Sequence, residues 1–152
     1  MKRGEQFKQI IDQNELKQLE SWTSKKCGDV VFDSDKDNWN QNTSVFDSKV
    51  MNRSNLMFVI EDTNNNKFGC YLPVKIDKYD TGVPGNKDMF LFSLKSNGRI
   101  DGMMKFEWKQ GRGYYLPNKS HGNLIYLGSG ADLGLRKQNH NRGWINQNDS
   151  YF

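Results

Sequence analysis

Three aspartates at alternate positions form the pattern in this chain that comes nearest to a metal-binding loop. In an EF-hand, carboxylates at the first, third and fifth positions ligate Ca²⁺, but glycine is also needed at the sixth position and glutamate at the twelfth. Counted from Asp33 through Asp35 and Asp37, the sixth position is Asn38 and the twelfth is Ser44. The aspartates therefore favour a helix start, where their oxygens accept backbone N–H groups, over a calcium site.

A glycine-rich segment at 128–134 has some of the features of a phosphate-binding loop. The dinucleotide fingerprint requires glycine where Leu133 stands, and the other common phosphate loop ends in Gly-Lys-Ser/Thr, which is absent here. The residues that follow alternate between apolar and small or polar, unlike a helix start. The segment is therefore predicted to be a tight turn between two strands.

Two histidines and two cysteines complete the candidates for catalysis or metal binding. His121 and His140 fall in predicted turns and outside any nucleophile-elbow motif. Cys27 and Cys70 are far apart and lack short ligand spacing, so they are expected to be unreactive core thiols and not redox sensors. We therefore predict no catalytic residue, no cofactor and no metal site, and we do not expect an enzyme.

The best candidate for partner binding is the basic segment that runs from Arg136 to Trp144. Arg136, Arg142 and Trp144 would form a basic–aromatic contact surface for an acidic protein partner. The alternative is that Trp144 folds back over the end of the domain as part of its core. Burial of Trp144 would decide between the two hypotheses.

Net charge leaves a second class of partner open. The chain carries +4 overall, and residues 99–152, with eight basic and four acidic side chains, account for all of it. A basic region of this kind also suits nucleic acid. Arginine, glycine and tyrosine are mixed in 110–115, as in RNA-contacting segments, although a hairpin turn is the preferred interpretation there.

The elements that would position these residues begin with a helix predicted over 5–22, where Ile10, Leu19 and Trp22 recur at helical spacing. It would either end a coiled coil or pack on the domain. A short strand at 27–32 and a second helix carrying Trp39 and Phe46 are predicted next. Residues 77–88 are predicted to be a long loop.

From residue 55 onward the pattern is that of short strands separated by turns. One hairpin is predicted over 56–60 and 68–72, and a second over 89–94 and 103–108. Later strands are predicted at 114–116, 124–127 and 132–135. The fold class is therefore mostly β (α+β), a two-sheet antiparallel β-sandwich with flanking helices. The expected core residues are Phe32, Trp39, Phe46, Phe58, Phe68, Phe90, Phe92 and Leu127.

Size and hydropathy limit the class of protein. The chain has 152 residues, which suits one domain, and its 12% aromatic content is too high for a disordered segment. No apolar run approaches the roughly 18 residues of a membrane span, and the first residues lack the apolar stretch of a signal peptide. We expect a cytoplasmic protein with no transmembrane segment.

The order of these motifs resembles the TLDc domain family. Five stretches carry the likeness: Val30-Val31-Phe32-Asp33-Ser34 with Trp39 to Phe46, Leu56 to Leu72 with its Phe68-Gly69-Cys70-Tyr71 return strand, Met89 to Leu94, Tyr126 to Leu135, and Ser150-Tyr151-Phe152. The resemblance covers 25–152, and the helix of 1–24 lies outside it. The family usually continues through a final strand with an acidic residue near a tryptophan, and the resemblance implies that this strand is missing here.

The resemblance also implies a function. The family is associated with protection against oxidative damage and, in several members, with binding and regulating the vacuolar proton pump. It has no general catalytic mechanism. The chain is therefore expected to be a non-catalytic intracellular protein-interaction module of the TLDc type. A basic nucleic-acid-binding module and an enzyme with a site built from scattered loops are the two alternatives.

Overall fold

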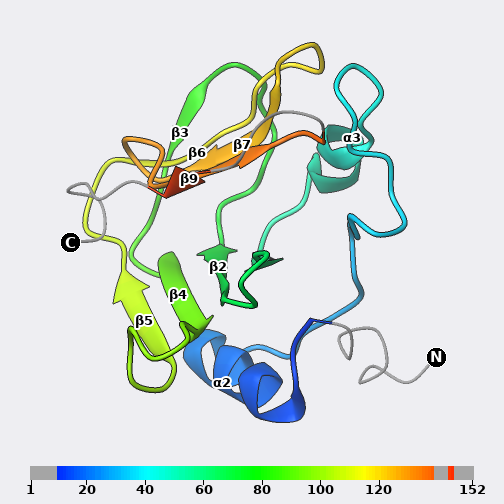
Figure 1. The fold of residues 1–152 in the computed structure, drawn as a ribbon. Helices are drawn as coiled ribbons and strands as arrows, with labels where there is room; N and C mark the ends of the chain where they lie inside the picture. Colours follow the sequence, from blue (N-terminus) through cyan, green and yellow to red (C-terminus); the bar gives the residue numbers. More distant parts are fainter. Residues whose placement is uncertain (1–9, 139–143, 146–152) are drawn as a thin grey trace.

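The computed structural model describes residues 10–138 and 144–145. Two helices and nine strands form in this part of the chain (Figure 1). In chain order they are α2 (Gln13–Thr23), α3 (Phe46–Val50), β1 (Leu56–Glu61), β2 (Lys67–Leu72), β3 (Gly82–Pro84), β4 (Phe90–Lys95), β5 (Met104–Glu107), β6 (Arg112–Tyr115), β7 (Asn123–Leu127), β8 (Leu133–Arg136) and β9 (Trp144–Ile145).

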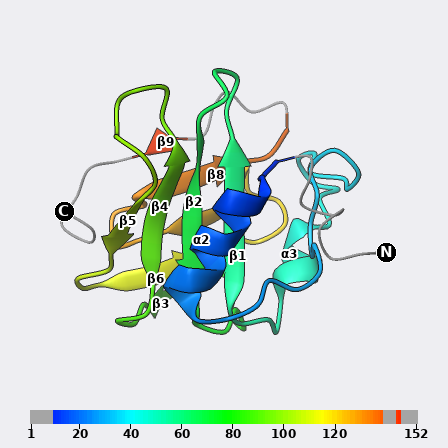
Figure 2. The same cartoon turned by 90° about the horizontal axis from the view of Figure 1, so that it is seen from below.

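The strands form two antiparallel sheets that pack face to face. One sheet has the order β1-β2-β4-β5 and the other has the order β3-β6-β7-β8-β9. Viewed from below, α2 lies across the outer face of the four-stranded sheet, while α3 lies at the side of the sandwich (Figure 2). The predicted fold class, a two-sheet antiparallel β-sandwich with flanking helices, is confirmed.

The main core lies between the two sheets. It contains Phe46 and Val50 of α3, alternate residues of the strands such as Phe58 and Cys70, and the fully buried Tyr114. The Tyr114 hydroxyl donates to the carbonyl of Lys75 at 3.2 Å and accepts the N–H of Asp77 at 3.1 Å. Burial raises the pKa of this phenol, which therefore stays neutral and ties the loop after β2 to the second sheet.

A second apolar layer lies between α2 and the four-stranded sheet. Leu19 of α2 is fully buried there against the outward side chains of the sheet, which include Tyr71, Phe90 and Phe92. Trp22 meets Phe90 edge to face, with ring centroids 5.9 Å apart. This sheet is therefore apolar on both faces.

The prediction of a core was correct for five of its eight residues, but their places differ. Phe46, Phe58 and Leu127 belong to the core between the sheets, whereas Phe90 and Phe92 lie under α2. The other three, Phe32, Trp39 and Phe68, are partly buried and pack against the main core from its edge.

The helix predicted over 5–22 begins later than expected, at Gln13; residues 5–9 lie outside the described residues. Asp12 and Glu15 form a capping box that sets this start. The Asp12 carboxylate accepts the Glu15 N–H at 2.8 Å, and the Glu15 carboxylate accepts the Asp12 N–H at 3.2 Å. Glu15 also pairs with Lys67 of β2 at 3.2 Å, which fixes the helix start on the sheet.

Two further predictions for the first third of the chain are wrong. Residues 27–32 form no strand, and the predicted second helix is reduced to a single turn after Asp33 and the five-residue α3. Local side-chain bonds explain the interruption: Asn38 accepts the N–H of Asn40 and the hydroxyl of Thr43, and Asn42 has a φ of 68°. Such contacts compete with helical hydrogen bonds, so the helix restarts only at Phe46.

The strands predicted from residue 55 onward agree with the structure to within a few residues, with two corrections, and the two-residue strand β9 lies beyond the last predicted strand. The predicted loop at 77–88 contains the short edge strand β3, which pairs with β6. The hairpin turn predicted at 110–115 is wrong: Arg112–Tyr115 form the strand β6, and the connection before it crosses from one sheet to the other, because β5 and β6 belong to different sheets. The glycine-rich segment at 128–134 does join β7 to β8, as expected.

Candidate interaction surface

Alternation along the strands gives the five-stranded sheet two different faces. Tyr114 and Leu127 pair across β6 and β7 and point into the core. Their neighbours Tyr115 and Tyr126 also pair, and successive side chains of a strand point to opposite faces. Tyr115 and Tyr126 therefore lie on the outer face of this sheet.

The outer tyrosines form a cluster with arginine. The rings of Tyr115 and Tyr126 meet edge to face, with centroids 5.9 Å apart and an angle of 70°. The guanidinium of Arg112 lies 5.7 Å from the Tyr115 ring centroid, within the range of a cation–π contact. Arg112 also donates to the Ser129 carbonyl at 2.8 Å, so the turn after β7 holds the guanidinium over the ring.

Two further side chains extend this cluster. The ring of His121 packs edge to face on Tyr126 at 6.1 Å, and its Nδ1 accepts the N–H of Asn123 at 3.1 Å. Arg136 of β8 pairs with Asn123 in the register, and it follows the inward Leu135. We call Arg112, Tyr115, His121, Tyr126 and Arg136 the tyrosine–arginine face.

The structure places the three predicted partner-binding residues unequally. Arg136 ends β8 and is part of the tyrosine–arginine face. Trp144 begins β9, where its backbone pairs with Gly134, but its side chain lies outside the described residues, as does the whole of Arg142. The choice between a contact tryptophan and a core tryptophan therefore stays a prediction.

Sequence reasoning missed the tyrosines and Arg112 as a set. The sequence patterns place Arg112 in a predicted turn, Tyr115 in that turn and in the strand predicted at 114–116, and Tyr126 in the strand predicted at 124–127, with nothing to join the three. The period-two alternation of strands could have found the tyrosines. If Tyr114 and Leu127 point into the core, their sequence neighbours Tyr115 and Tyr126 must point outward.

A small cavity at the end of the same sheet contains a buried lysine. Lys137 is only 4% exposed, and its ammonium donates to the Lys119 carbonyl. Burial lowers the pKa of this ammonium, while the nearby Asp47 acts in the opposite direction. The cavity measures about 10 Å³, room for about one water, so Lys137 serves to anchor the loop at 117–119 and not to receive a ligand.

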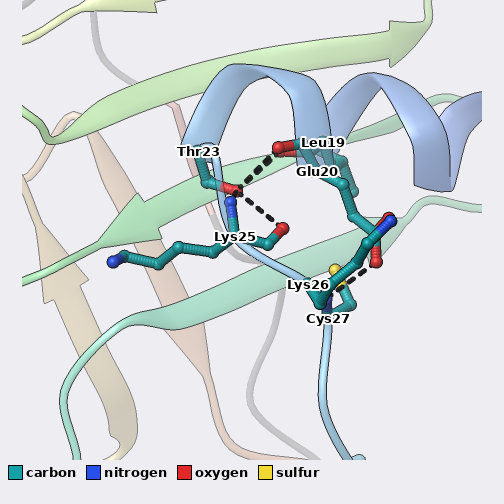
Figure 3. Close-up of polar contacts among 6 residues, drawn as sticks. All are labelled: Leu19, Glu20, Thr23, Lys25, Lys26 and Cys27. Atoms are coloured by element: carbon teal, nitrogen blue, oxygen red, sulfur yellow. Dashed lines mark hydrogen bonds and ion pairs between the residues drawn. The ribbon is translucent and has the colours of Figure 1, made fainter.

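The C-terminal end of α2 offers a second candidate, an open hollow of about 320 Å³. Figure 3 shows the polar contacts of the residues around it. Lysines line this hollow, but one of them is already paired with a carboxylate. The Glu20 carboxylate forms an ion pair with Lys26 at 2.9 Å and accepts the Cys27 N–H at 2.9 Å. The hydroxyl of Thr23 donates to the Leu19 carbonyl at 2.9 Å. These contacts secure the exit from the helix, and a helix C-terminus disfavours anions.

Chemistry of other kinds has little support in the part of the chain that the structure describes. No group of three His, Cys, Asp or Glu side chains is placed to hold a metal ion there. Cys70 is fully buried in β2 and Cys27 is half-buried after α2. None of the described helices is long and apolar enough to cross a bilayer.

Comparison with known proteins agrees with this architecture. The family model of the TLDc domain matches residues 4–150, so the match includes α2 as well as both sheets. A search of curated proteins found no match. The motifs, the sandwich of two antiparallel sheets and the extent of the family match lead to one assignment: the chain belongs to the TLDc domain family.

Proposed function

We propose that this TLDc domain is a non-catalytic protein-interaction module and that its tyrosine–arginine face binds the partner. One observation carries the proposal. The four-stranded sheet has its outer face covered by α2, but no described helix lies over the outer face of the five-stranded sheet (Figures 1 and 2). Tyrosine and arginine are, with tryptophan, the side chains enriched among the few residues that dominate the binding energy of protein interfaces.

The charge of this region indicates the chemistry of the partner. Between Arg112 and Ile145 the sequence has five lysines or arginines and one acidic residue. That one, Asp132, is fully buried, and Lys137 among the basic residues is buried as well. The carboxylate of Asp80 accepts the Tyr115 hydroxyl at 3.4 Å, so Arg112 and Arg136 against one carboxylate leave the face with a small excess of positive charge. An acidic protein surface would therefore be steered toward the tyrosine–arginine face.

The finer parts of the proposal rest on the family alone. They are an intracellular, cytoplasmic location, a link to oxidative-stress resistance, and regulation of the vacuolar proton pump. They make the pump a rational first partner to test.

Nucleic acid is the second candidate, and Arg112 over Tyr115 is the observation that favours it, since bases stack on such platforms. It ranks lower because the two tyrosine rings meet at 70°, so their faces do not form one stacking surface. Binding to phosphates would also fall steeply with salt.

Capture of the purified vacuolar proton pump on the immobilised chain tests the proposal. Tyr115→Ala and Arg112→Ala should each weaken capture, whereas Met104→Ala should not. Met104 is a matched control, because it is 43% exposed and lies on β5 of the other sheet. Equal capture by all variants would contradict the proposed surface. Salt-sensitive retention on single-stranded RNA without pump capture would favour the second candidate.

A further inference from the structure

The tips of two hairpins meet at one end of the four-stranded sheet. One tip, at 62–66, joins β1 to β2, and the other begins the loop between β4 and β5. In the second tip, Asn97 and Gly98 have φ angles of 52° and 87°, and the Arg99 N–H donates to the Ser96 carbonyl at 3.3 Å. Two successive residues with positive φ closed by this bond form a tight turn that Asn-Gly suits.

The side-chain amide of Asn97 ties the two tips together. Its Nδ2 donates to the Asn64 carbonyl at 2.7 Å and to Oδ1 of Asn66 at 2.9 Å. Asn66 is buried, and its own amide donates to the Asp62 carboxylate at 2.8 Å. The Asp62 carboxylate also accepts the Asn64 and Asn66 N–H groups, each at 2.9 Å. One neutral donor, the amide of Asn97, therefore faces two oxygens beside a carboxylate.

The sequence and the turn make this amide chemically labile. Asparagine is among the thermolabile residues, and the following glycine has no side chain to block attack by its backbone nitrogen. At Gly98 the surroundings are also open, since an added Cβ would meet no atom within 4 Å. Both Asn97 and Gly98 are exposed to water.

We propose that Asn97–Gly98 is a deamidation site whose conversion cuts the link between the two hairpin tips. The Gly98 nitrogen bonds to Cγ of Asn97 and gives up its proton, and the Cγ–Nδ2 bond breaks to release ammonia. Water then opens the resulting cyclic imide at either of its two C–N bonds and leaves aspartate or isoaspartate. No oxidant, metal or enzyme is needed.

The product reverses the character of the contact. A carboxylate at position 97 is only an acceptor, and it would face the Asn64 carbonyl and the Asn66 Oδ1 close to the negative Asp62. The tips should then separate. The change should reach α2, because Lys67, which follows the first tip, holds Glu15 of the helix start. While the amide is bonded it is held in place, so the folded chain reacts more slowly than an opened one.

Mass spectrometry of the full chain, incubated at neutral pH and physiological temperature, tests the site. Trypsin cuts after Lys95 and Arg99, so the fragment Ser96–Arg99 reports Asn97 alone. We expect aspartate and isoaspartate to accumulate there, and about five-fold faster in Asn66→Ala, the factor for losing one hydrogen bond. Asn118→Ala is a control at a distant loop and should leave the rate unchanged.

Asn97→Asp tests whether deamidation separates the two tips, because this variant carries the aspartate product at position 97 before any incubation. Its denaturation midpoint should be lower, and amide exchange at 62–66 and in the first turn of α2 should be faster than in the native chain. An unmodified Asn97 in both the native chain and Asn66→Ala would overturn the site. An Asn97→Asp variant with native midpoint and exchange would overturn the link.

Discussion

The two sheets of this sandwich have outer faces of opposite character. On the four-stranded sheet, Tyr71, Phe90 and Phe92 point outward and α2 covers them. On the five-stranded sheet, Tyr115 and Tyr126 take the equivalent outward positions beside Arg112, and no described helix lies over them. An apolar outer face must be buried, whereas an amphipathic one remains stable in water and available to a partner. The choice of residue at alternate strand positions thus decides which face is structural.

The largest expected effect is on the covered face. Leu19→Ala removes a fully buried side chain from under α2 and should destabilise the chain by about 2–5 kcal/mol. Chemical denaturation measures this loss. Leu16→Ala is the matched control on the same helix, and its smaller loss should follow from its partial burial. Equal, small losses for both would show that α2 is not a stable cover.

A smaller loss of stability is expected at the ion pair that joins the start of α2 to the four-stranded sheet. Glu15→Gln keeps an acceptor for the Asp12 N–H but removes the ion pair between Glu15 and Lys67. Both side chains of this ion pair are nearly buried. The free energy of unfolding should fall by about 1.5–3 kcal/mol, the value of a hydrogen bond to a charged group. Lys67→Met in the Glu15→Gln background should then cost little more. A further large loss in the double variant would assign Lys67 another role.

Smaller still is the stability effect on the open face. Tyr126→Ala should lower the free energy of unfolding by about 0.5–1.5 kcal/mol, the value of an aromatic pair, because Tyr126 is only half-buried. Partner capture should nevertheless fall sharply. A thermal midpoint that collapses in Tyr126→Ala while capture persists would make this face structural and erase the contrast between the sheets.

The smallest expected effect is on the stability of the fold at acidic pH. Hydrogen bonds from the Asn66 side chain and backbone hold the pKa of Asp62 below its ordinary value of 3.8. The folded state therefore favours the charged form, so this contribution is present above that value and is lost as the pH falls through the lower, folded-state pKa. Asp62→Asn should flatten the acid limb of a pH–stability curve slightly. An identical acid limb in both proteins would show that ionisation of Asp62 does not contribute to stability.

Much of the fold could be predicted because strand patterns are local. A near-continuous apolar run at 56–60, a polar turn at 62–66 and a return strand at 68–72 predict a hairpin, and the structure has this hairpin nearly as predicted. Gly69 in its return strand also has a physical reason, since a Cβ there would overlap the Phe58 carbonyl. The segment from Cys27 to Val45 was harder, because side-chain bonds of Asp33 and Asn38 override the helical spacing of Trp39 and Phe46.

The candidate site was only partly predictable. Arg136 was singled out for its charge, and it does lie on the open face. The Tyr115–Tyr126 pair joins two strands that are not neighbours in the predicted hairpins, so it depends on a register that the sequence does not state. Arg112 and Tyr115 lie on the same strand, β6, so their contact is local, whereas the crossover of β6 into the second sheet, which places Tyr115 beside Tyr126, is a property of the topology.

Amide hydrogen exchange of the chain, free and bound to the purified vacuolar proton pump, tests the central claim most directly. We predict slower exchange on binding in peptides that contain Arg112–Tyr115 and Asn123–Leu127, with exchange in α2 and β5 unchanged. Slower exchange confined to α2 or β5, with β6 and β7 unaffected, would contradict the assignment of the tyrosine–arginine face as the surface that binds the partner.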